Sequence, residues 1–346
     1  MKKTITSFFK RLDEEFVDGV NAEKTCDIGD WLLYFAWDVI NQLTFSKPMG
    51  FMDQGGDSLG ILTTAEKALV YFAVIGQMPA LDKWLAKNPV WPLGPPTFDP
   101  VAKFCVQQLR AREEGADGHD AGQRDMLDEF LTARKTDPDA LTDVVVIGAM
   151  MVNVIAGADT TAILLRAIIY FVLKNPRVYV RLQHDIDEAG VAGDPVDYAT
   201  AERLPYLDAV IKESARMHPS VAMLLERVVP PGNDLVLSDG TVIPSGTIVG
   251  MNPFVIHRNK TVFGQDAASF NPDRWLRAED EAEDAYEARI SEMKHADLTF
   301  GAGNRVCIGK NISILETYKV IAALFLRYDV SQSAVTWRLH LLRLLC

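Results

Sequence analysis

The chain has 346 residues, of which 48% are hydrophobic and 24% charged, enough apolar material for one large domain or two ordinary ones. Its formal net charge of -12 argues against a nucleic-acid partner and offers no basic surface overall for anionic lipid. The four cysteines, at positions 26, 105, 307 and 346, form no CxxC pair, which argues against a disulfide framework or a structural zinc site.

The segments up to residue 135 have the hydrophobic periodicity of helices joined by polar or Pro- and Gly-rich connectors. The first residues, MKKTITSFFKRLDEEF, lack the apolar stretch of a signal peptide. Asp30 is the expected cap of a helix over residues 27–46. Further helices are predicted at residues 63–76, 100–114 and 125–135, with an irregular connector at 88–98 and a polar loop at 113–122.

The longest predicted helix covers residues 142–174. Thr142 or Asp143 can cap it, and Pro176 stops it. Its apolar stretch is long enough for a membrane span, but it carries charged residues such as Asp159, and a charge at mid-membrane depth costs at least about 3 kcal/mol. We therefore expect a helix that is buried in the middle of a soluble protein.

Helices are again predicted over residues 176–189 and 207–218, and the composition then changes. Residues 225–254 contain β-branched runs separated by Pro-Gly, Asp-Gly and Ser-Gly pairs, which predicts a small strand-and-turn region. His257 has no second ligand at a suitable spacing, so it is predicted to be a structural residue of this β region. The acidic, Ala-rich residues 277–294 are predicted to be a solvated surface insertion. The expected fold class is mainly α with a minor β region.

A glycine-rich loop at residues 300–309 (FGAGNRVCIG) leads into the last predicted helix. Glycines on both sides of Cys307 allow the backbone to approach a flat ligand and to turn tightly. A helix that starts just after Cys307 points its free N–H groups and positive dipole end at the sulfur, which favours the thiolate. Arg305 is placed to meet an anionic edge of the ligand. Composition alone also fits a glycine-rich turn around a buried free cysteine.

Two other segments combine noteworthy residues on predicted helices. Residues 156–161 (AGADTT) place Gly, Asp and Thr inside the long helix, although all three are poor helix formers. A kinked core helix with a back-bonded threonine would explain them without any ligand. Glu213 and Arg216 share a helix face at i and i+3 and can form an ion pair, but this spacing occurs by chance in many helices.

Taken together, these segments resemble the cytochrome P450 family. The loop matches every fixed position of that family's haem-binding signature, F-G-x-G-x-R-x-C-x-G, and residues 156–161 match its oxygen-binding helix, A-G-x-D-T-T. The family completes its ExxR pair with an arginine in a later loop, which residues 271–275 (NPDRW) resemble, although Glu more often precedes this arginine and Phe follows it. The resemblance covers roughly residues 8–329 and is closest to fungal members similar to pisatin demethylase.

The resemblance implies roles for the residues of the cysteine loop. Cys307 would ligate the iron of haem b (iron protoporphyrin IX), where a thiolate ligand favours O–O cleavage. Arg305 would pair with one haem propionate and Arg227 with the second. Phe300 and Gly301 would lie against the haem.

It also implies roles for residues elsewhere in the chain. In the oxygen-binding helix, Gly157 and Ala158 would leave room for dioxygen, and Asp159 and Thr160 would help to deliver protons to it. The structural cluster that fixes the cysteine loop would consist of Glu213, Arg216 and Arg274.

For the chain as a whole, the resemblance implies a single partial P450 domain that lacks its N-terminal part. Family members carry a membrane anchor, most of a larger β-sheet and a helix with a W-x-x-x-R motif upstream, and none of these is expected in this chain. Residues 331–346 are expected to be an atypical C-terminal tail, because they lack the pattern of the family's closing β-hairpin.

The implied function is a monooxygenase of secondary metabolism that inserts one oxygen atom from O2 into a lipophilic organic substrate. Its electrons would come from NADPH through a separate NADPH–cytochrome P450 reductase, since no G-x-G-x-x-G follows a predicted strand here. Full-length members lie on the cytoplasmic face of the endoplasmic reticulum; without an anchor, this chain is expected in the cytoplasm. Two alternatives stay open: an inactive truncated fragment that binds haem, and a peroxide-using haem enzyme, against which the Asp159-Thr160 pair argues.

Overall fold

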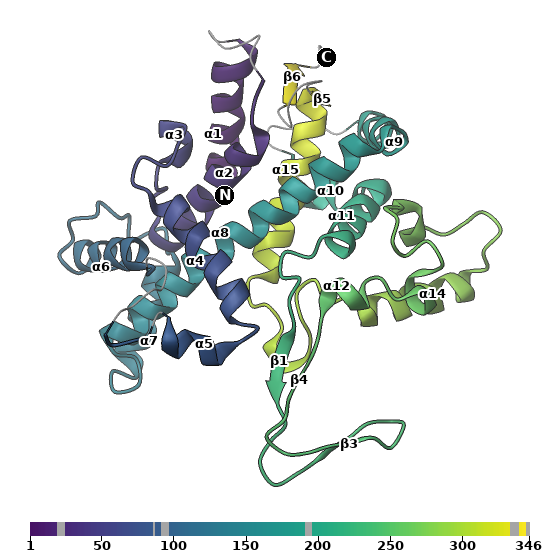
Figure 1. Ribbon diagram of the computed structural model, residues 1–346. Helices are drawn as coiled ribbons and strands as arrows, with labels where there is room; N and C mark the ends of the chain where they lie inside the picture. The colour runs from purple at the N-terminus through teal and green to yellow at the C-terminus, as the bar shows by residue number, and fades with distance from the viewer. Residues whose placement is uncertain (19–24, 86, 91–96, 191–195, 333–338, 344–346) are drawn as a thin grey trace. The chain divides into compact units, whose positions relative to one another are not determined.

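The computed structural model describes residues 1–18, 25–85, 87–90, 97–190, 196–332 and 339–343. The chain divides into two compact units, of which unit 1 comprises Met1–Ala162 with Ser331–Leu342 and unit 2 comprises Ile163–Val330 with Arg343–Cys346. Both units are built mainly from helices (Figure 1), so the predicted fold class is confirmed. The single-domain expectation stays a prediction.

Up to Ala162, the described residues of unit 1 form helices and the loops that join them. Its elements are α1 (Lys2–Leu12), a π-helical turn (Asp13–Val17), α2 (Ile28–Phe45), α3 (Phe51–Gln54), α4 (Ile61–Ile75), α5 (Pro79–Trp84), α6 (Asp99–Glu113), α7 (Met126–Thr136) and the first part of α8 (Asp143–Lys174). One apolar cluster joins α2, α4, α6, α7 and α8 through buried residues that include Trp37, Ile61, Cys105, Leu127 and Val154. This cluster forms one part of the core of unit 1, and fully buried residues of α1 and α2 such as Phe8 and Phe35 lie outside it.

The sequence located the longer helices α2, α4, α6, α7 and α8 to within two residues but missed α1, α3 and α5. In α1 the apolar residues recur at helical spacing, and Ile5, Phe8, Phe9 and Leu12 are buried. The expected cap of α2 was wrong by one turn: the carboxylate of Asp27 accepts the N–H of Asp30, so Asp27 is the N-cap. Of the irregular connector expected at 88–98, residues 91–96 lie outside the described part of the chain.

Helix α8 begins at Asp143 and ends at Lys174, immediately before Asn175-Pro176, as predicted. By length and composition alone it could cross a membrane, and 28% of its most apolar window is buried. In its first half only a stripe at every fourth residue is buried: Val146, Met150, Val154 and Ala158. The expectation of a helix buried on all sides is therefore wrong for this half, because Val144 and Val152 are exposed.

Unit 2 combines helices with short strands. Its elements are the end of α8, α9 (Pro176–Glu188), α10 (Tyr198–Ala201), α11 (Pro205–Met217), β1 (Leu225–Val228), β2 (Leu235–Val236), β3 (Val242–Ile243), β4 (Ile248–Met251), α12 (Pro253–Ile256), α13 (Lys260–Phe263), the 3-10 turns η2 (Pro272–Trp275) and η3 (Gly303–Arg305), α14 (Glu283–Ala296), α15 (Lys310–Arg327) and the first three residues of β5 (Tyr328–Gln332). Helices α9, α11 and α15 pack on one another.

The predicted strand region consists of two antiparallel pairs. β1 pairs with β4, with Leu225 opposite Met251 and Val228 opposite Ile248. β2 pairs with β3 in a hairpin that projects away from the helices of this unit (Figure 1). The strand-and-turn prediction is therefore confirmed.

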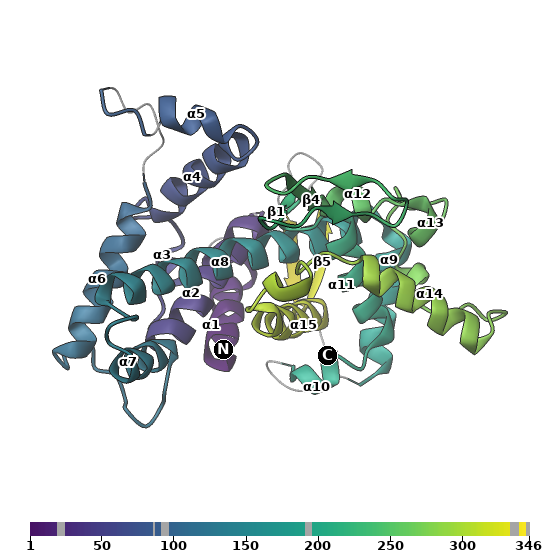
Figure 2. The same ribbon diagram turned by 90° about the horizontal axis from the view of Figure 1, so that it is seen from below.

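Two expectations about unit 2 and the tail need correction. The supposed surface insertion contains helix α14, which lies beside α13 (Figure 2) and buries Ile290 and Met293 against Phe263 and Trp275. The tail lacks the sequence pattern of the family's closing β-hairpin, yet β5 pairs with β6 (Leu339–Arg343); that residues 331–346 are atypical for the family stays a prediction. Residues 333–338 and 344–346 of that tail lie outside the described part of the chain.

Candidate functional site

The cysteine loop of unit 2 is tightly turned. Gly301 and Gly303 have φ of +70° and +66°, a left-handed conformation that residues with a Cβ rarely adopt. The N–H of Cys307 donates to the carbonyl of Phe300 at 2.8 Å, which closes the loop on itself. Phe300 is half-buried, and the ammonium of Lys310, the first residue of α15, lies 5.7 Å from its ring centroid. The loop thus holds Cys307 just ahead of the N-terminus of α15, as predicted.

Cys307 is exposed, whereas Cys26 and Cys105 are buried. The reading of this loop as a turn around a buried free cysteine is therefore wrong. Next to the thiol, Val306 is 45% exposed and Ile308 is fully exposed. An exposed sulfur flanked by exposed aliphatic side chains is a surface that a flat, apolar ligand would cover.

The two predicted propionate partners, Arg305 and Arg227, line the same hollow of unit 2. Arg305 ends the turn η3 and Arg227 lies on β1, and both are exposed. Both line one hollow of about 580 Å³, with the other walls formed by Leu225, Glu226, Val228 and Ile248. Two guanidinium groups beside aliphatic walls suit a ligand with an apolar body and an anionic edge. With the sulfur of Cys307 as an iron ligand, these residues fit haem.

The segment 156–161 lies in unit 1, on α8. The hydroxyl of Thr160 donates to the carbonyl of Ala156 at 2.7 Å, so the threonine is back-bonded, as the reading without a ligand predicted. Packing also explains the glycine at position 157, since a Cβ there would lie only 2.8 Å from the Cδ1 of Ile40. Ala158 is fully buried in the core of unit 1. The roles of Gly157, Ala158, Asp159 and Thr160 toward dioxygen stay predictions.

The predicted cluster of Glu213, Arg216 and Arg274 is confirmed in unit 2. Arg216 binds Glu213 through two hydrogen bonds, Nη2–Oε1 at 2.7 Å and Nε–Oε2 at 2.8 Å. Arg274 donates from Nε to Oε1 of the same carboxylate at 3.0 Å. The side chains of Glu213, Arg216 and Arg274 are 0%, 1% and 6% exposed. Such a buried set is stable only when each charge has a partner, because removing charges from water is costly.

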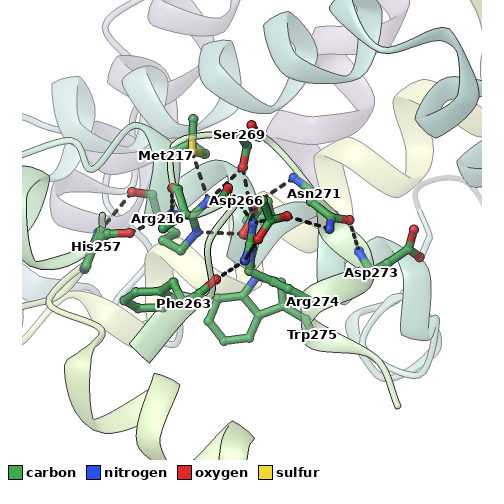
Figure 3. A network of polar contacts seen from close by, with 12 residues as sticks. Arg216, Met217, His257, Phe263, Asp266, Ser269, Asn271, Asp273, Arg274 and Trp275 are labelled. Carbon is green, nitrogen blue, oxygen red and sulfur yellow. Dashed lines mark hydrogen bonds and ion pairs between the residues drawn. The ribbon is translucent and has the colours of Figure 1, made fainter. Parts of the chain in front are cut away.

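The remaining donors of the two arginines bind the surrounding loop. Arg216 donates to the carbonyls of His257 and Ala267, each at 2.6 Å, and Arg274 pairs with the carboxylate of Asp266 at 3.0 Å. Figure 3 shows these side chains converging with Ser269, whose carbonyl accepts from both arginines. The cluster therefore joins α11 to the whole stretch between α12 and α14.

Two partners of Glu213 were not predicted. The indole N–H of Trp275 donates to Oε2 at 2.9 Å, and the backbone N–H of Asn271 donates to Oε1 at 2.8 Å (Figure 3 labels both residues). The tryptophan was noted in the sequence only as a departure from the usual phenylalanine. The residue type itself could have predicted this contact, since an indole carries an N–H donor that a phenyl ring lacks.

His257 is structural, as predicted, but it follows α12 instead of lying in the β region. It is completely buried. Its Nδ1 lies 3.1 Å from the carbonyl oxygen of Arg216, and its Nε2 accepts the N–H of Leu298 at 2.8 Å. His257 thus connects the end of the ExxR pair to the residue that precedes the cysteine loop by two positions.

Unit 1 contains a second charged cluster that the sequence did not reveal, because the segment looked like a polar loop. Arg112 of α6 pairs with Asp125 and Asp128 at 2.7 Å each, and also with Asp117. His119 lies 2.9 Å from Asp128. All three carboxylates of the cluster pair with the guanidinium of Arg112, and Asp125 and Asp128 also form the capping box of α7. The cluster therefore holds the α6–α7 loop closed without any ligand.

The family model of the cytochrome P450 family matches residues 1–339 of the chain. Similar proteins are cytochrome P450 monooxygenase cfoH of Aspergillus candidus, 40% identical over 98% of this chain, and cytochrome P450 monooxygenase cicH of Emericella nidulans, 38% identical over 99%. Another is cytochrome P450 monooxygenase vrtE of Penicillium aethiopicum, 36% identical over 93%. The chain spans 63%, 67% and 62% of the lengths of these three relatives.

Proposed function

The chain belongs to the cytochrome P450 family, and on that premise we propose that it acts as a haem-thiolate monooxygenase, inserting one oxygen atom from O2 into a lipophilic organic substrate. The observation that carries the proposal is the exposed thiol of Cys307 in a tightly turned loop that also bears Arg305. Arg305 shares a hollow with Arg227 that is also lined by Glu226 and by three aliphatic side chains, so unit 2 offers two cations beside apolar walls, and the thiol of Cys307 follows Arg305 by two residues. Few ligands other than haem call for all three.

Each residue of the loop has a physical task in this proposal. Cys307 would hold the iron through its thiolate, and Gly301, whose left-handed backbone favours a residue without a Cβ, allows the tight turn of the loop that bears this cysteine. Arg305 and Arg227 bind the two carboxylates at the edge of haem b by charge-assisted hydrogen bonds. When bound, the haem supplies the redox chemistry that activates O2.

The oxygen-binding segment supplies protons in this proposal. Asp159 can relay a proton, and the hydroxyl of Thr160 can pass it on. Because that hydroxyl now donates to the carbonyl of Ala156, it has to rotate before it can donate elsewhere. The electrons are proposed to come from NADPH through a separate cytochrome P450 reductase. Work at the cytoplasmic face of the endoplasmic reticulum, in fungal secondary metabolism, is part of the same proposal.

Replacing the ligand tests the proposal most directly. Cys307→Ala is expected to abolish the red-shifted Soret band of a thiolate-ligated ferrous–CO haem and to lower haem retention, since no other residue of the loop can replace a thiolate. The measurement is the CO difference spectrum, together with the haem content per chain. Cys105→Ala, which alters a buried free cysteine in unit 1, is the matched control and should keep the spectrum.

A normal thiolate spectrum in Cys307→Ala would show that the ligand is assigned wrongly. Absence of that band in the unaltered chain would favour the haem-binding fragment over the enzyme. Turnover distinguishes the peroxide-using alternative. A peroxide-using enzyme would form product from peroxide but none from NADPH plus reductase, whereas the monooxygenase would form product from NADPH plus reductase.

A further inference from the structure

His257 makes two long-range connections from a fully buried position in unit 2. One reaches the carbonyl of Arg216 at the end of α11, and the other the backbone N–H of Leu298. Each partner lies 41 residues away along the chain, in opposite directions. The phenyl ring of Phe263 packs edge-on against the imidazole, with ring centroids 6.2 Å apart. The side chain thus lies between Arg216 of the ExxR helix, which Figure 3 shows beside it, and Leu298, two residues before the cysteine loop.

These two contacts require one protonation state of the imidazole. The N–H of Leu298 is a donor, so Nε2 must present a lone pair to it. The carbonyl of Arg216 is an acceptor, so Nδ1 must carry the hydrogen. Only the neutral tautomer with its proton on Nδ1 satisfies both groups, and a proton added to Nε2 would remove the bond to Leu298.

The contact with Leu298 continues to Cys307 through two further backbone hydrogen bonds. The carbonyl of Leu298 accepts the N–H of Gly301 at 3.0 Å, and the carbonyl of Phe300 accepts the N–H of Cys307 at 2.8 Å. Leu298 is itself buried, so its amide would lack a partner if His257 released it. The position of the sulfur is therefore connected to α11 through the imidazole.

The surroundings of His257 favour the neutral form. Burial lowers the pKa of His257 most, and the positive charges of Arg216 and Arg258 lower it further. Asp297, whose carboxylate lies 3.4 Å from Nε2, and the hydrogen bond with Arg216 act in the opposite direction without reversing the shift. The neutral form is thus kept in the folded chain, while the unfolded chain takes up the proton near pH 6.5, the ordinary histidine value.

The lowered pKa of His257 makes the stability of the folded chain depend on pH. Because the folded state binds fewer protons than the unfolded state, the contribution of His257 to stability is complete above about pH 6.5. It is lost progressively as the pH falls below that value toward the lowered pKa of the folded chain. A protonated imidazole could still bind Asp297, but it could no longer accept from Leu298.

We propose that His257 is the positioning residue of the thiolate ligand, and that in its neutral form it fastens the loop bearing Cys307 to the Glu213–Arg216–Arg274 cluster. Protonation releases the loop, so acid converts the thiolate-ligated haem to a form without this ligand while the ExxR cluster stays paired. This inference rests on the proposed function, because it concerns how that haem is held.

Two substitutions separate the connections. In His257→Gln the amide oxygen takes the place of Nε2 and can accept from Leu298, but the group does not titrate. In His257→Asn the shorter amide takes the place of Nδ1 and can donate to Arg216, but it cannot reach Leu298. Both remove the imidazole, so a role in packing alone predicts similar behaviour of the two variants.

The first measurement is the ferrous–CO spectrum across pH. We expect His257→Gln to keep the thiolate band at neutral pH and to lose it at a lower pH than the unaltered chain does. His257→Asn should lack most of that band even at neutral pH. The second measurement needs no haem: amide hydrogen exchange in peptides covering residues 298–307 should be about tenfold faster in His257→Asn than in His257→Gln, because a buried amide has lost its acceptor.

The outcomes are distinguishable from failure of the proposed function. If the unaltered chain shows no thiolate band but the exchange difference appears, the function fails and the positioning role stands. Equal spectra and equal exchange in the two variants would overturn the inference. If His257→Asn does not fold, the acid midpoint of His257→Gln decides: a midpoint equal to that of the unaltered chain also overturns it.

Discussion

The Arg112 cluster of unit 1 and the Glu213 cluster of unit 2 are arranged in opposite ways. In unit 1 a single cation, Arg112, serves three carboxylates, all within 16 residues along the chain. In unit 2 a single carboxylate, Glu213, serves two arginines and the indole of Trp275, which lies 62 residues away. The first cluster closes a local loop, whereas the second joins segments that are distant in the sequence.

The clusters also differ in their contact with water. In unit 1 the side chains of Asp117 and Asp128 are 13% and 22% exposed, so water also solvates these carboxylates. In unit 2 the Glu213 carboxylate is completely buried, and it is the carboxylate that pairs with Arg216, whose side chain is 1% exposed. The loss of stability when one partner is removed therefore depends less on the number of ion pairs than on whether water can replace that partner.

The largest effect is expected when the central carboxylate is neutralised. Glu213→Gln removes the carboxylate that pairs with the buried Arg216 and leaves its guanidinium with uncharged acceptors, so we expect a loss of about 3–5 kcal/mol of unfolding free energy. Urea denaturation measures it. Asp273→Asn is the matched control, because its pair with Arg181 is exposed and should cost less than about 1 kcal/mol. Equal losses in both variants would contradict the contrast.

A smaller loss is expected in unit 1. Arg112→Met should cost about 2 kcal/mol at neutral pH, since charge-assisted bonds to carboxylates are lost but water reaches part of the site. The exposed Arg124, paired with Glu129, offers the control Arg124→Met, which should change stability little.

The pH dependence sharpens this second test. Burial raises the pKa of Asp117 and of Asp128, but the groups around each carboxylate together outweigh it and both net pKa values are lowered. For Asp117 these groups are the guanidinium of Arg112 and the N–H of His119, and for Asp128 they are the N–H of Asp125, the imidazole of His119 and the charge of Arg112. Their stabilising contribution is present above about pH 4 and is lost as the pH falls through the lowered folded values. The deficit of Arg112→Met should therefore shrink in acid. A deficit that grew there would refute the assignment.

The smallest effect concerns the donor that was unexpected. Trp275→Phe keeps a ring in the pocket but removes the hydrogen bond to Glu213, and we expect a loss of about 1.5 kcal/mol by denaturation. Trp84→Phe, at a residue 74% exposed, is the control and should be close to neutral. No difference between the two would mean that Glu213 does not need its fifth donor.

Prediction from sequence succeeded where the information is local. Helix periodicity placed α2, α4, α6, α7 and α8, and Asn175-Pro176 marked the end of α8 correctly. It failed for the acidic segment containing α14, because Ile290 and Met293 became core residues only once α13 and η2 lay beside them. A pattern of charges shows which face is polar but cannot show what will cover the rest.

By itself, the sequence determined the family, the mainly helical fold, the turned loop around Cys307 and the partnership of Glu213 with Arg216 and Arg274. Each of these follows from residues close together in the chain or from a motif in fixed order. Tertiary structure alone decided that Arg227 and Arg305 share one hollow, that Trp275 completes the Glu213 cluster, and that His257 reaches Leu298. Those contacts join segments dozens of residues apart, and their geometry depends on how buried surfaces pack, which no local propensity encodes.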